Sequence, residues 1–298
     1  MCKDKENFGE NSHICQSMYI FKHSGDLLDY LSNNIAKNKN IGFVPTMGAL
    51  HGGHIALVKE AKDRNDIVVC SIFVNPTQFN DRNDFDNYPS TIEDDILCLE
   101  KAETNILFLP GVDEVYPNGL TASKKYDFGG LDNVLEGQYR PGHFNGVAQV
   151  VERLLDLVKP DNLYMGQKDY QQVLIVKKML EQYDKKINLI ACPTVREKNG
   201  LAMSSRNARL SEEGKKNAAR IYEILRNTQA MISKQSIAET KVWATHQLGE
   251  IPQAKLEYLE FVNAASLKTV ENIGDAEKIL ICVACFIEGV RLIDNLIV

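Results

Sequence analysis

Two histidines stand three residues apart in the stretch VPTMGALHGGH, which runs from Val44 to His54. His51 and His54 enclose two glycines and follow a short apolar run. Histidines at such spacing can bind a metal, transfer a proton or hydrogen-bond to phosphate. Glycines let the backbone approach a ligand closely, and free N–H groups at a helix start attract anions. The stretch predicts a phosphate site rather than a metal site, because it lacks the HExxH spacing and a third ligand.

Other polar segments carry residues that suit a nucleotide. In GQKDYQQ, Lys168 is a mobile cation that can meet phosphate. The segment GLAMSSRNARLS supplies hydroxyls and Arg206, whose guanidinium can bind phosphate through two hydrogen bonds. The residue types leave alternatives open. Asp169 could cap the following helix, Gln172 could lie on a solvated face, and the arginine segment could be a polar loop.

Two aspartates, a histidine and a cysteine pair each have two interpretations. Asp94 and Asp95 could hold a Mg²⁺ ion that accompanies a nucleotide, or they could favour the dipole of the helix that they begin. His143 could serve the site or anchor its loop. Cys282 and Cys285 form a C-x-x-C inside an apolar run, so packing in a core is favoured over zinc binding.

Strand-like and helix-like segments alternate from Ile41 onward. The apolar positions of GVAQVVERLLDLVKP recur at helical spacing along one face, and Pro160 ends that helix. Apolar runs rich in β-branched residues, such as 67–74, are typical of buried parallel strands. The sequence therefore predicts strands at 41–46, 67–74, 105–110, 162–166 and 187–194, and helices at 54–64, 91–103, 170–183 and within 146–160.

The unusual polar residues gather at the carboxyl ends of these predicted strands. That edge is where doubly wound α/β sheets bind ligands, and purely structural roles would scatter such residues to both edges. The groups that follow a strand are Met47, His51 and His54; Asn75, Thr77 and Gln78; Gln167, Lys168, Asp169 and Gln172; and Val195 and Arg196.

The alternation of strands and helices ends near residue 193, which predicts a second, smaller domain. Helical segments follow it first, and the strand-like segments LEYLEFVN and KILICVACFI come last, which indicates an α+β fold. We expect residues 1–17 to be a disordered extension, residues 18–192 to form an α/β domain around a parallel sheet, and residues 193–298 to form an α+β lid domain.

Composition disfavours several classes of protein. Hydrophobic residues make up 44% and charged residues 25% of the 298 residues, as in globular proteins. The formal net charge of −6 argues against a nucleic-acid partner. No apolar run is long enough to span a bilayer, and the N-terminus lacks the apolar core of a signal peptide. We expect a cytoplasmic protein with no membrane partner, which the seven scattered cysteines also favour.

At these residues the sequence resembles the pantothenate synthetase family, whose members are pantoate–β-alanine ligases of the nucleotidyltransferase superfamily. The resemblance covers the chain from about Met18 to Val298. It rests on blocks that occur in the family's order: PTMGALHGGH, SIFVNPTQF, YPSTIEDD, LEGQYRPGHFNGV, GQKDYQQ and GLAMSSRN. This ordered set is far more specific than the HxGH element alone.

The resemblance implies a Rossmann-like fold and an AMP-forming ligation in two steps. ATP, accompanied by Mg²⁺, adenylates the carboxylate of (R)-pantoate, which releases pyrophosphate. The amine of β-alanine then attacks pantoyl adenylate, which gives pantothenate and AMP. The resemblance also implies a homodimer.

The resemblance assigns a role to each matching residue. His54 matches the proton donor, and His51, Lys168 and Arg206 are placed to offset charge on the phosphates. Gln78 and Gln172 match the glutamines that hold pantoate, and Gln78 also borders the β-alanine site. Gln167 stands where many members carry Glu, so an amide replaces a carboxylate at this position. The residues that match ATP contacts are Met47, Gly48, Ala49, Leu50, His51, Gly52, Gly53, His54, Gly166, Gln167, Lys168, Asp169, Val195, Met203, Ser204, Ser205 and Arg206.

Three other functions share part of this pattern. Another adenylyltransferase would carry the HxGH element but has no reason to carry both Gln78 and the GQKDYQQ block. A non-catalytic nucleotide-binding protein could lose Lys168 or a histidine, and here they are all present. The acidic balance and the lack of an evident tRNA-binding domain disfavour a tRNA ligase.

Overall fold

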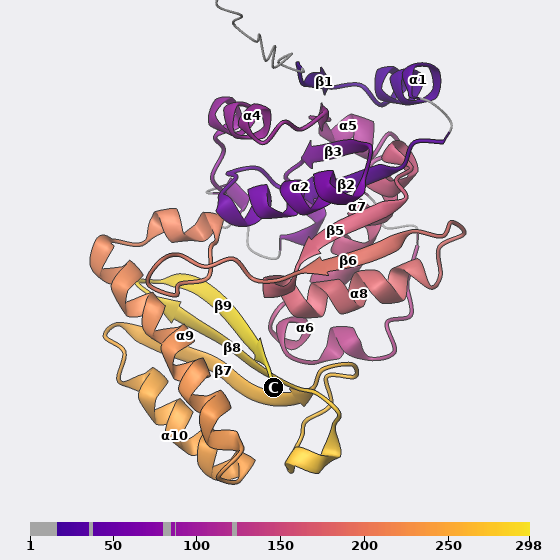
Figure 1. Cartoon of the computed structure of the whole chain (residues 1–298). Helices are drawn as coiled ribbons and strands as arrows, with labels where there is room; N and C mark the ends of the chain where they lie inside the picture. The colour runs from indigo at the N-terminus through magenta and orange to yellow at the C-terminus, as the bar shows by residue number, and fades with distance from the viewer. Residues whose placement is uncertain (1–16, 36–37, 80–84, 87, 121–123) are drawn as a thin grey trace, which may run out of the picture.

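The computed structural model describes residues 17–35, 38–79, 85–86, 88–120 and 124–298. Over these residues the chain forms a six-stranded sheet and, after it, a three-stranded sheet (Figure 1). In Figure 1 the second sheet lies beneath the first, with its helices in orange at the lower left. The extension predicted for residues 1–17 falls outside the described residues, apart from Ser17.

The first sheet is parallel and is ordered β1-β4-β3-β2-β5-β6. From β2 the chain adds β3 and β4 on one side, and later it adds β5 and β6 on the other. This reversal opens a crevice between the carboxyl ends of β2 and β5, where doubly wound sheets bind ligands. The strands are β1 (Tyr19–Phe21), β2 (Ile41–Thr46), β3 (Ile67–Ile72), β4 (Ile106–Phe108), β5 (Asn162–Gly166) and β6 (Asn188–Cys192).

Helices cover both faces of this sheet. One face packs against α2 (Gly52–Arg64) and α4 (Ile92–Lys101). The other packs against α1 (Ser24–Asn34), α7 (His143–Val158) and α8 (Tyr170–Leu180). The apolar stripe predicted on α7 is buried as expected, since its residues are all at most 5% exposed: Val147, Val150, Val151, Leu154, Leu155 and Val158. The short helices α5 (Val112–Val115) and α6 (Glu136–Tyr139) lie in the connection before α7.

The second sheet is antiparallel, with the order β7-β8-β9. Its strands are β7 (Ala254–Asn263), β8 (Ile279–Ile287) and β9 (Val290–Ile297), and its helices are α9 (Glu212–Ile232) and α10 (Ile237–Gly249). Alternate residues of β8 point to opposite faces. Ile281 and Cys285 pack with the two helices, whereas Leu280 and Cys282 join the core of the first domain. Cys282 and Cys285 therefore face opposite ways in a buried strand, which confirms the packing interpretation.

The structure confirms an α/β domain followed by a smaller α+β region, and it corrects several details. The sequence did not predict β1, α1 or β9. Strand β3 ends two residues before the predicted limit of 74, at Ile72. The boundary at residues 192 and 193 stays a prediction, because the second sheet shares the core of the first domain. Among the helices of the described residues, none has both the length and the apolar character needed to cross a bilayer.

Candidate active site

Two adjoining cavities open at the carboxyl ends of the parallel strands. One, of about 210 Å³, lies over β2, β3 and β5. The other, of about 460 Å³, lies between the first domain and the second sheet. Because they share lining residues, they form one cleft between the two parts of the chain. The shared residues are Met47, Gln78, Lys168, Asp169, Gln172, Ser204 and Arg206.

The loop after β2 is held by a buried aspartate. Gly48 and Ala49 both adopt positive φ angles, of 80° and 48°, which a β-carbon makes costly at Ala49. Asp95, only 2% exposed, accepts the backbone N–H groups of Ala49 and Leu50 at 2.9 and 2.7 Å. The Thr91 hydroxyl donates to the same carboxylate at 3.2 Å. These charge-assisted bonds hold the loop in its strained shape.

The two histidines cap the helix that follows. His51 is the N-cap of α2, and its Nδ1 accepts the N–H of Gly53 at 3.1 Å. His54 reaches back, and its Nδ1 accepts the N–H of His51 at 3.3 Å. The ring centroids are 4.1 Å apart. Because both Nδ1 atoms accept, each neutral ring carries its proton on Nε2, which leaves Nε2–H as a donor.

Both imidazoles are held in the neutral form. Burial, and then the Lys168 ammonium, lower the pKa of His51 to about 4. Burial, and then His51 and Lys168, lower the pKa of His54 to about 3. At neutral pH the pair therefore offers hydrogen bonds rather than positive charge. A proton on Nδ1 would also break the cap that the ring makes.

The glycines of HGGH allow close packing around the start of α2. A β-carbon on Gly53 would lie 2.8 Å from Cε1 of His51, so a side chain there would displace the ring. A β-carbon on Gly52 would lie 2.9 Å from the sulfur of Met203, which comes from the C-terminal part of the chain. The second glycine thus makes room for the capping ring, and the first lets the C-terminal segment close over the helix start.

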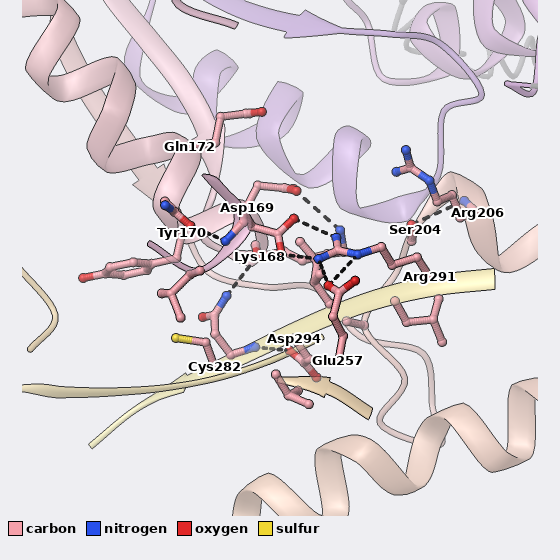
Figure 2. Close-up of a pocket in the computed structure, with 18 of the residues that line it drawn as sticks. Lys168, Asp169, Tyr170, Gln172, Ser204, Arg206, Glu257, Cys282, Arg291 and Asp294 are labelled. Atoms are coloured by element: carbon pink, nitrogen blue, oxygen red, sulfur yellow. Dashed lines mark hydrogen bonds and ion pairs between the residues drawn. The ribbon is translucent and has the colours of Figure 1, made fainter. Parts of the chain in front are cut away.

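The loop after β5 brings a cation to the same place. Residues Gln167–Asp169 form a 3-10 turn, η3, between β5 and α8. Lys168 and Asp169 line both cavities, and Nζ of Lys168 lies 3.6 Å from Oδ2 of Asp169. Figure 2 shows Lys168, Asp169 and Tyr170 beside the yellow strand β9, which carries Asp294. The side chain of Gln167 lines neither cavity.

The C-terminal part contributes a hairpin and a turn. The N–H of Met203 donates to the carbonyl of Val195 at 3.0 Å, which brings these two residues together. In the following turn, η4 (Ser205–Arg209), the Ser205 hydroxyl donates to the carbonyl of Ala49 at 2.9 Å. This bond joins the MSSR segment to the loop after β2. Arg206 lines both cavities, and its guanidinium lies 5.8 Å from the ring centroid of Tyr88.

Arg196 belongs to the scaffold rather than to the cleft. Its guanidinium forms two hydrogen bonds with the carboxylate of Asp294, at 2.6 and 2.9 Å. It also stacks on Tyr222 at 3.6 Å and donates to the carbonyl of Gly200. The ion pair ties the base of the Val195–Met203 hairpin to the second sheet.

A second ion pair crosses from the first domain to this sheet. Arg291 of β9 donates to both carboxylate oxygens of Glu136, at 2.7 and 2.8 Å, and also pairs with Glu257 (Figure 2). Glu136 further accepts the Tyr258 hydroxyl at 2.7 Å. Burial opposes the charged form of Glu136, but the hydrogen bonds and charge of Arg291 prevail and lower its pKa. These four residues line the larger cavity, and the contacts among them hold its two walls together.

Gln78 is held through its backbone. The carbonyl of Gln78 lies 2.7 Å from Nδ1 of the buried His143, and an N–H of Arg140 donates to it at 3.4 Å. The side-chain amide contacts Asn75 and Met47 and lines both cavities. Burial, followed by the charge of Arg140, lowers the pKa of His143 to about 4. His143 therefore anchors the segment that presents Gln78.

The two glutamines of DYQQ have different roles. Gln171 is buried and bonds only backbone: it donates to the carbonyls of Leu131 and Val134 and accepts the N–H of Glu136. Gln171 lines only the larger cavity, whereas Gln172 lines both cavities. The side-chain amide of Gln171 is thus taken up by backbone groups of the scaffold, and Gln172 belongs to the wall that the two cavities share.

The structure brings most of the predicted site residues into the cleft. The predicted residues that line a cavity are Met47, His51, Gly53, His54, Gln78, Gly166, Lys168, Asp169, Gln172, Val195, Met203, Ser204, Ser205 and Arg206. Those that line neither cavity are Gly48, Ala49, Leu50, Gly52, Gln167, Asp94 and Asp95. Sequence reasoning missed Asn295, whose amide contacts the backbone of η3.

The predicted Mg²⁺ pair does not fit the geometry. Both oxygens of Asp95 are engaged by backbone N–H groups, and Asp94 is exposed. Within the described residues, no group of three or more His, Cys, Asp and Glu side chains could hold a metal ion. Asp95 instead acts as the anchor of the loop after β2.

Comparisons with known proteins agree with this geometry. Residues 19–297 match the family model described as pantoate-beta-alanine ligase. The chain is 45% identical to a pantothenate synthetase of Cytophaga hutchinsonii, over 90% of this chain and 95% of that protein. It is 42% identical to a pantothenate synthetase of Bacteroides fragilis, over 91% and 95% of the two chains.

Solved structures of such enzymes share the fold. The crystal structure of pantothenate synthetase from Thermus thermophilus matches with a TM-score of 0.86 and 38% identity, over 94% of this chain and 99% of that one. A pantoate-beta-alanine ligase from Francisella tularensis, complexed with beta-gamma ATP and beta-alanine, matches with a TM-score of 0.78 and 40% identity, over 94% and 97%. The chain therefore belongs to the pantoate–β-alanine ligase family and joins pantoate to β-alanine to give pantothenate.

Proposed function

We propose that the ligation runs through pantoyl adenylate, and that both steps take place in the cleft between the two parts of the chain. The observation that carries this proposal is the convergence of His51, His54, Lys168 and Arg206 on one cavity, with Gln78 and Gln172 in its wall. The Francisella relative, which binds beta-gamma ATP and beta-alanine, supports the same choice of ligands.

The phosphates of ATP would lie at the start of α2. The dipole of this 13-residue helix favours an anion there. His51 and His54 would donate through Nε2–H, and Lys168 and Arg206 would supply positive charge from opposite sides of the cleft. Charge that grows on phosphate oxygens during adenylation is offset best by donors already fixed in place.

Adenylation needs no acid or base from the protein. The carboxylate of pantoate attacks the α-phosphorus, and pyrophosphate leaves without taking up a proton. Neutral imidazoles therefore suffice as hydrogen-bond donors, and we assign His54 that role instead of proton donor. The remaining ATP contacts are proposed for Gly166–Asp169, Val195 and Met203–Arg206, most of which line the cleft.

Pantoate would lie between the two amides. Gln78 and Gln172 can each donate and accept hydrogen bonds, which suits the hydroxyls and the carboxylate of pantoate. Uncharged groups leave the attacking carboxylate free of a fixed ion pair. β-Alanine would enter beside Gln78 and attack the acyl carbon, with AMP as the leaving group.

Mg²⁺ would enter with ATP as part of the substrate. Magnesium usually binds through phosphate oxygens and keeps several waters, so it does not require an all-protein site. We do not assign it to Asp94 and Asp95. Three predictions remain predictions: a lid role for residues 193–298, a homodimer and a cytoplasmic location. The hydrogen bond from Ser205 to Ala49 supports the lid role.

Isotope exchange between pyrophosphate and ATP tests the order of steps. Exchange should require pantoate and Mg²⁺ but not β-alanine. Lys168→Ala should slow the exchange by roughly a hundredfold, as expected for a lost charge partner of the transition state. The matched control is Lys62→Ala, because this lysine pairs with Glu103 and lines neither cavity. Exchange that depends on β-alanine, or equal rates for the two variants, would overturn the proposal.

A further inference from the structure

Strand β9 contacts the loop that carries Lys168. The side-chain amide nitrogen of Asn295 donates to the carbonyl of Gln167 at 3.1 Å and to the carbonyl of Lys168 at 2.8 Å. Two adjacent carbonyls can only accept, so the NH₂ group must face them, and its two N–H bonds match them in number. One side chain of the second sheet thus holds two successive peptide units of η3.

Asn295 is itself fixed in place. Its side chain is 5% exposed, and its backbone lies opposite Cys282 in the β8–β9 ladder. Its N–H also donates to the carboxylate of Asp294 at 2.8 Å. Burial of a polar side chain costs rotamer entropy and desolvation. Packing alone does not require a polar residue at this position.

The turn that Asn295 holds has little support of its own. The N-cap of η3 makes no side-chain hydrogen bond, and the turn is only three residues long. Lys168 presents its ammonium to the cavity that His51 and His54 also line. A shift of this turn would therefore move the cation relative to both imidazoles.

We propose that Asn295 is a positioning residue for Lys168, and that the second sheet sets the place of this cation through it. The proposal rests on the function proposed above for Lys168. The neighbouring Asp294 holds Arg196 at the base of the Val195–Met203 hairpin. Consecutive residues of β9 therefore hold two segments that are proposed to contact ATP, one from each part of the chain.

The test uses Asn295→Leu, which keeps the size of the side chain and removes both donors, and Asn295→Ser, which keeps one donor. Pyrophosphate–ATP exchange is measured with pantoate and without β-alanine. For Asn295→Leu we expect the kcat of exchange to fall by about 10- to 100-fold, with a smaller change in the KM for pantoate, because a displaced group acts mainly in the transition state. Asn295→Ser should lie between Asn295→Leu and the wild type.

Cys285→Ala is the control for a purely structural loss. Cys285 is buried in β8 opposite Leu292 of β9 and lines neither cavity, so this variant should lower the melting temperature and keep kcat. If Asn295→Leu melts below the assay temperature, Asn295→Ser provides the measurement. Normal kcat in a folded Asn295→Ser or Asn295→Leu variant would overturn the proposal.

A double-mutant cycle separates this proposal from the function of Lys168. If Asn295 acts through Lys168, Asn295→Leu should have little further effect on kcat in a Lys168→Ala background. An undiminished loss in that background would overturn the positioning role. If Lys168→Ala itself leaves exchange unchanged, the proposed function of Lys168 fails instead, whatever Asn295 does.

Discussion

At pH 5.5 the two cleft histidines, His51 and His54, should still be neutral. The perturbation is acidification of the free enzyme from pH 7.5 to pH 5.5, which would protonate an ordinary imidazole. In this structure Nδ1 of His51 and Nδ1 of His54 each accept a backbone N–H, and both rings are desolvated. Protonation would turn each acceptor into a donor that faces another donor, so the helix cap opposes it.

The expected size of the effect follows from the shifted pKa values. With a pKa of about 4 for His51, about 3% of that ring is protonated at pH 5.5. With a pKa of about 3 for His54, about 0.3% is protonated. An unshifted histidine of pKa 6.5 would be about 90% protonated at the same pH. The two outcomes differ by more than an order of magnitude.

Long-range ¹H–¹⁵N NMR of the imidazoles reads both tautomer and charge. The signals are assigned with His51→Gln and His54→Gln, and we expect Nε2–H tautomers that persist from pH 7.5 to 5.5. His23 is an internal control, because its hydrogen bond with Glu114 raises its pKa and it should be charged at pH 5.5. A titration midpoint above pH 6 for His51 or His54, or an Nδ1–H tautomer, would refute the argument.

Three further predictions concern pantoate, the loop after β2 and acid stability. Gln172→Ala should raise the KM for pantoate far more than that for ATP; an equal rise would remove Gln172 from the pantoate site. Asp95→Asn should lower the unfolding free energy by roughly 1.5–3 kcal/mol, as for hydrogen bonds to a charged group, whereas the exposed Asp94→Asn should change neither stability nor the Mg²⁺ requirement. Because the folded pKa of His54 lies below its unfolded value, the contribution of His54 to the free energy of unfolding is present above pH 6.5 and is lost as pH falls toward 3. In denaturant unfolding, the free energy of unfolding of His54→Gln should therefore fall less on acidification than that of the wild type. An equal fall in the two proteins would contradict the pKa shift.

The sequence predicted the parallel sheet well because its signals are local. The apolar runs of β2 and β5 and the stripe of α7 have the lengths and periods of their elements. It missed β9 because Arg291, Asp294 and Asn295 interrupt the apolar pattern. These residues are tolerated in a largely buried strand because each has a partner elsewhere in the chain, which no local pattern reveals.

The candidate site divides in the same way. Residues that line the cleft, such as His54 and Lys168, were predicted because ligand chemistry restricts their type. Residues that hold them were not, because an aspartate or asparagine can bond backbone from any direction. Asp95 illustrates the difference: its position in the first turn of α4 suggested a metal ligand or a helix-dipole role, whereas its carboxylate faces the N–H groups of a distant loop.

The helix cap explains why neutral histidines and two separate cations occur together. Since His51 and His54 must stay neutral to cap α2, they would give the phosphates hydrogen bonds but no positive charge, and in the proposed complex Lys168 and Arg206 would supply that charge. The backbone of Lys168 is held from the second sheet by Asn295, and Arg206 lies in the turn that Ser205 fastens to Ala49. Each cation thus depends on a contact between the two parts of the chain. We therefore expect the charge around the phosphates to be complete only when those parts are together, which makes closure of the cleft a requirement of adenylation rather than a consequence of it.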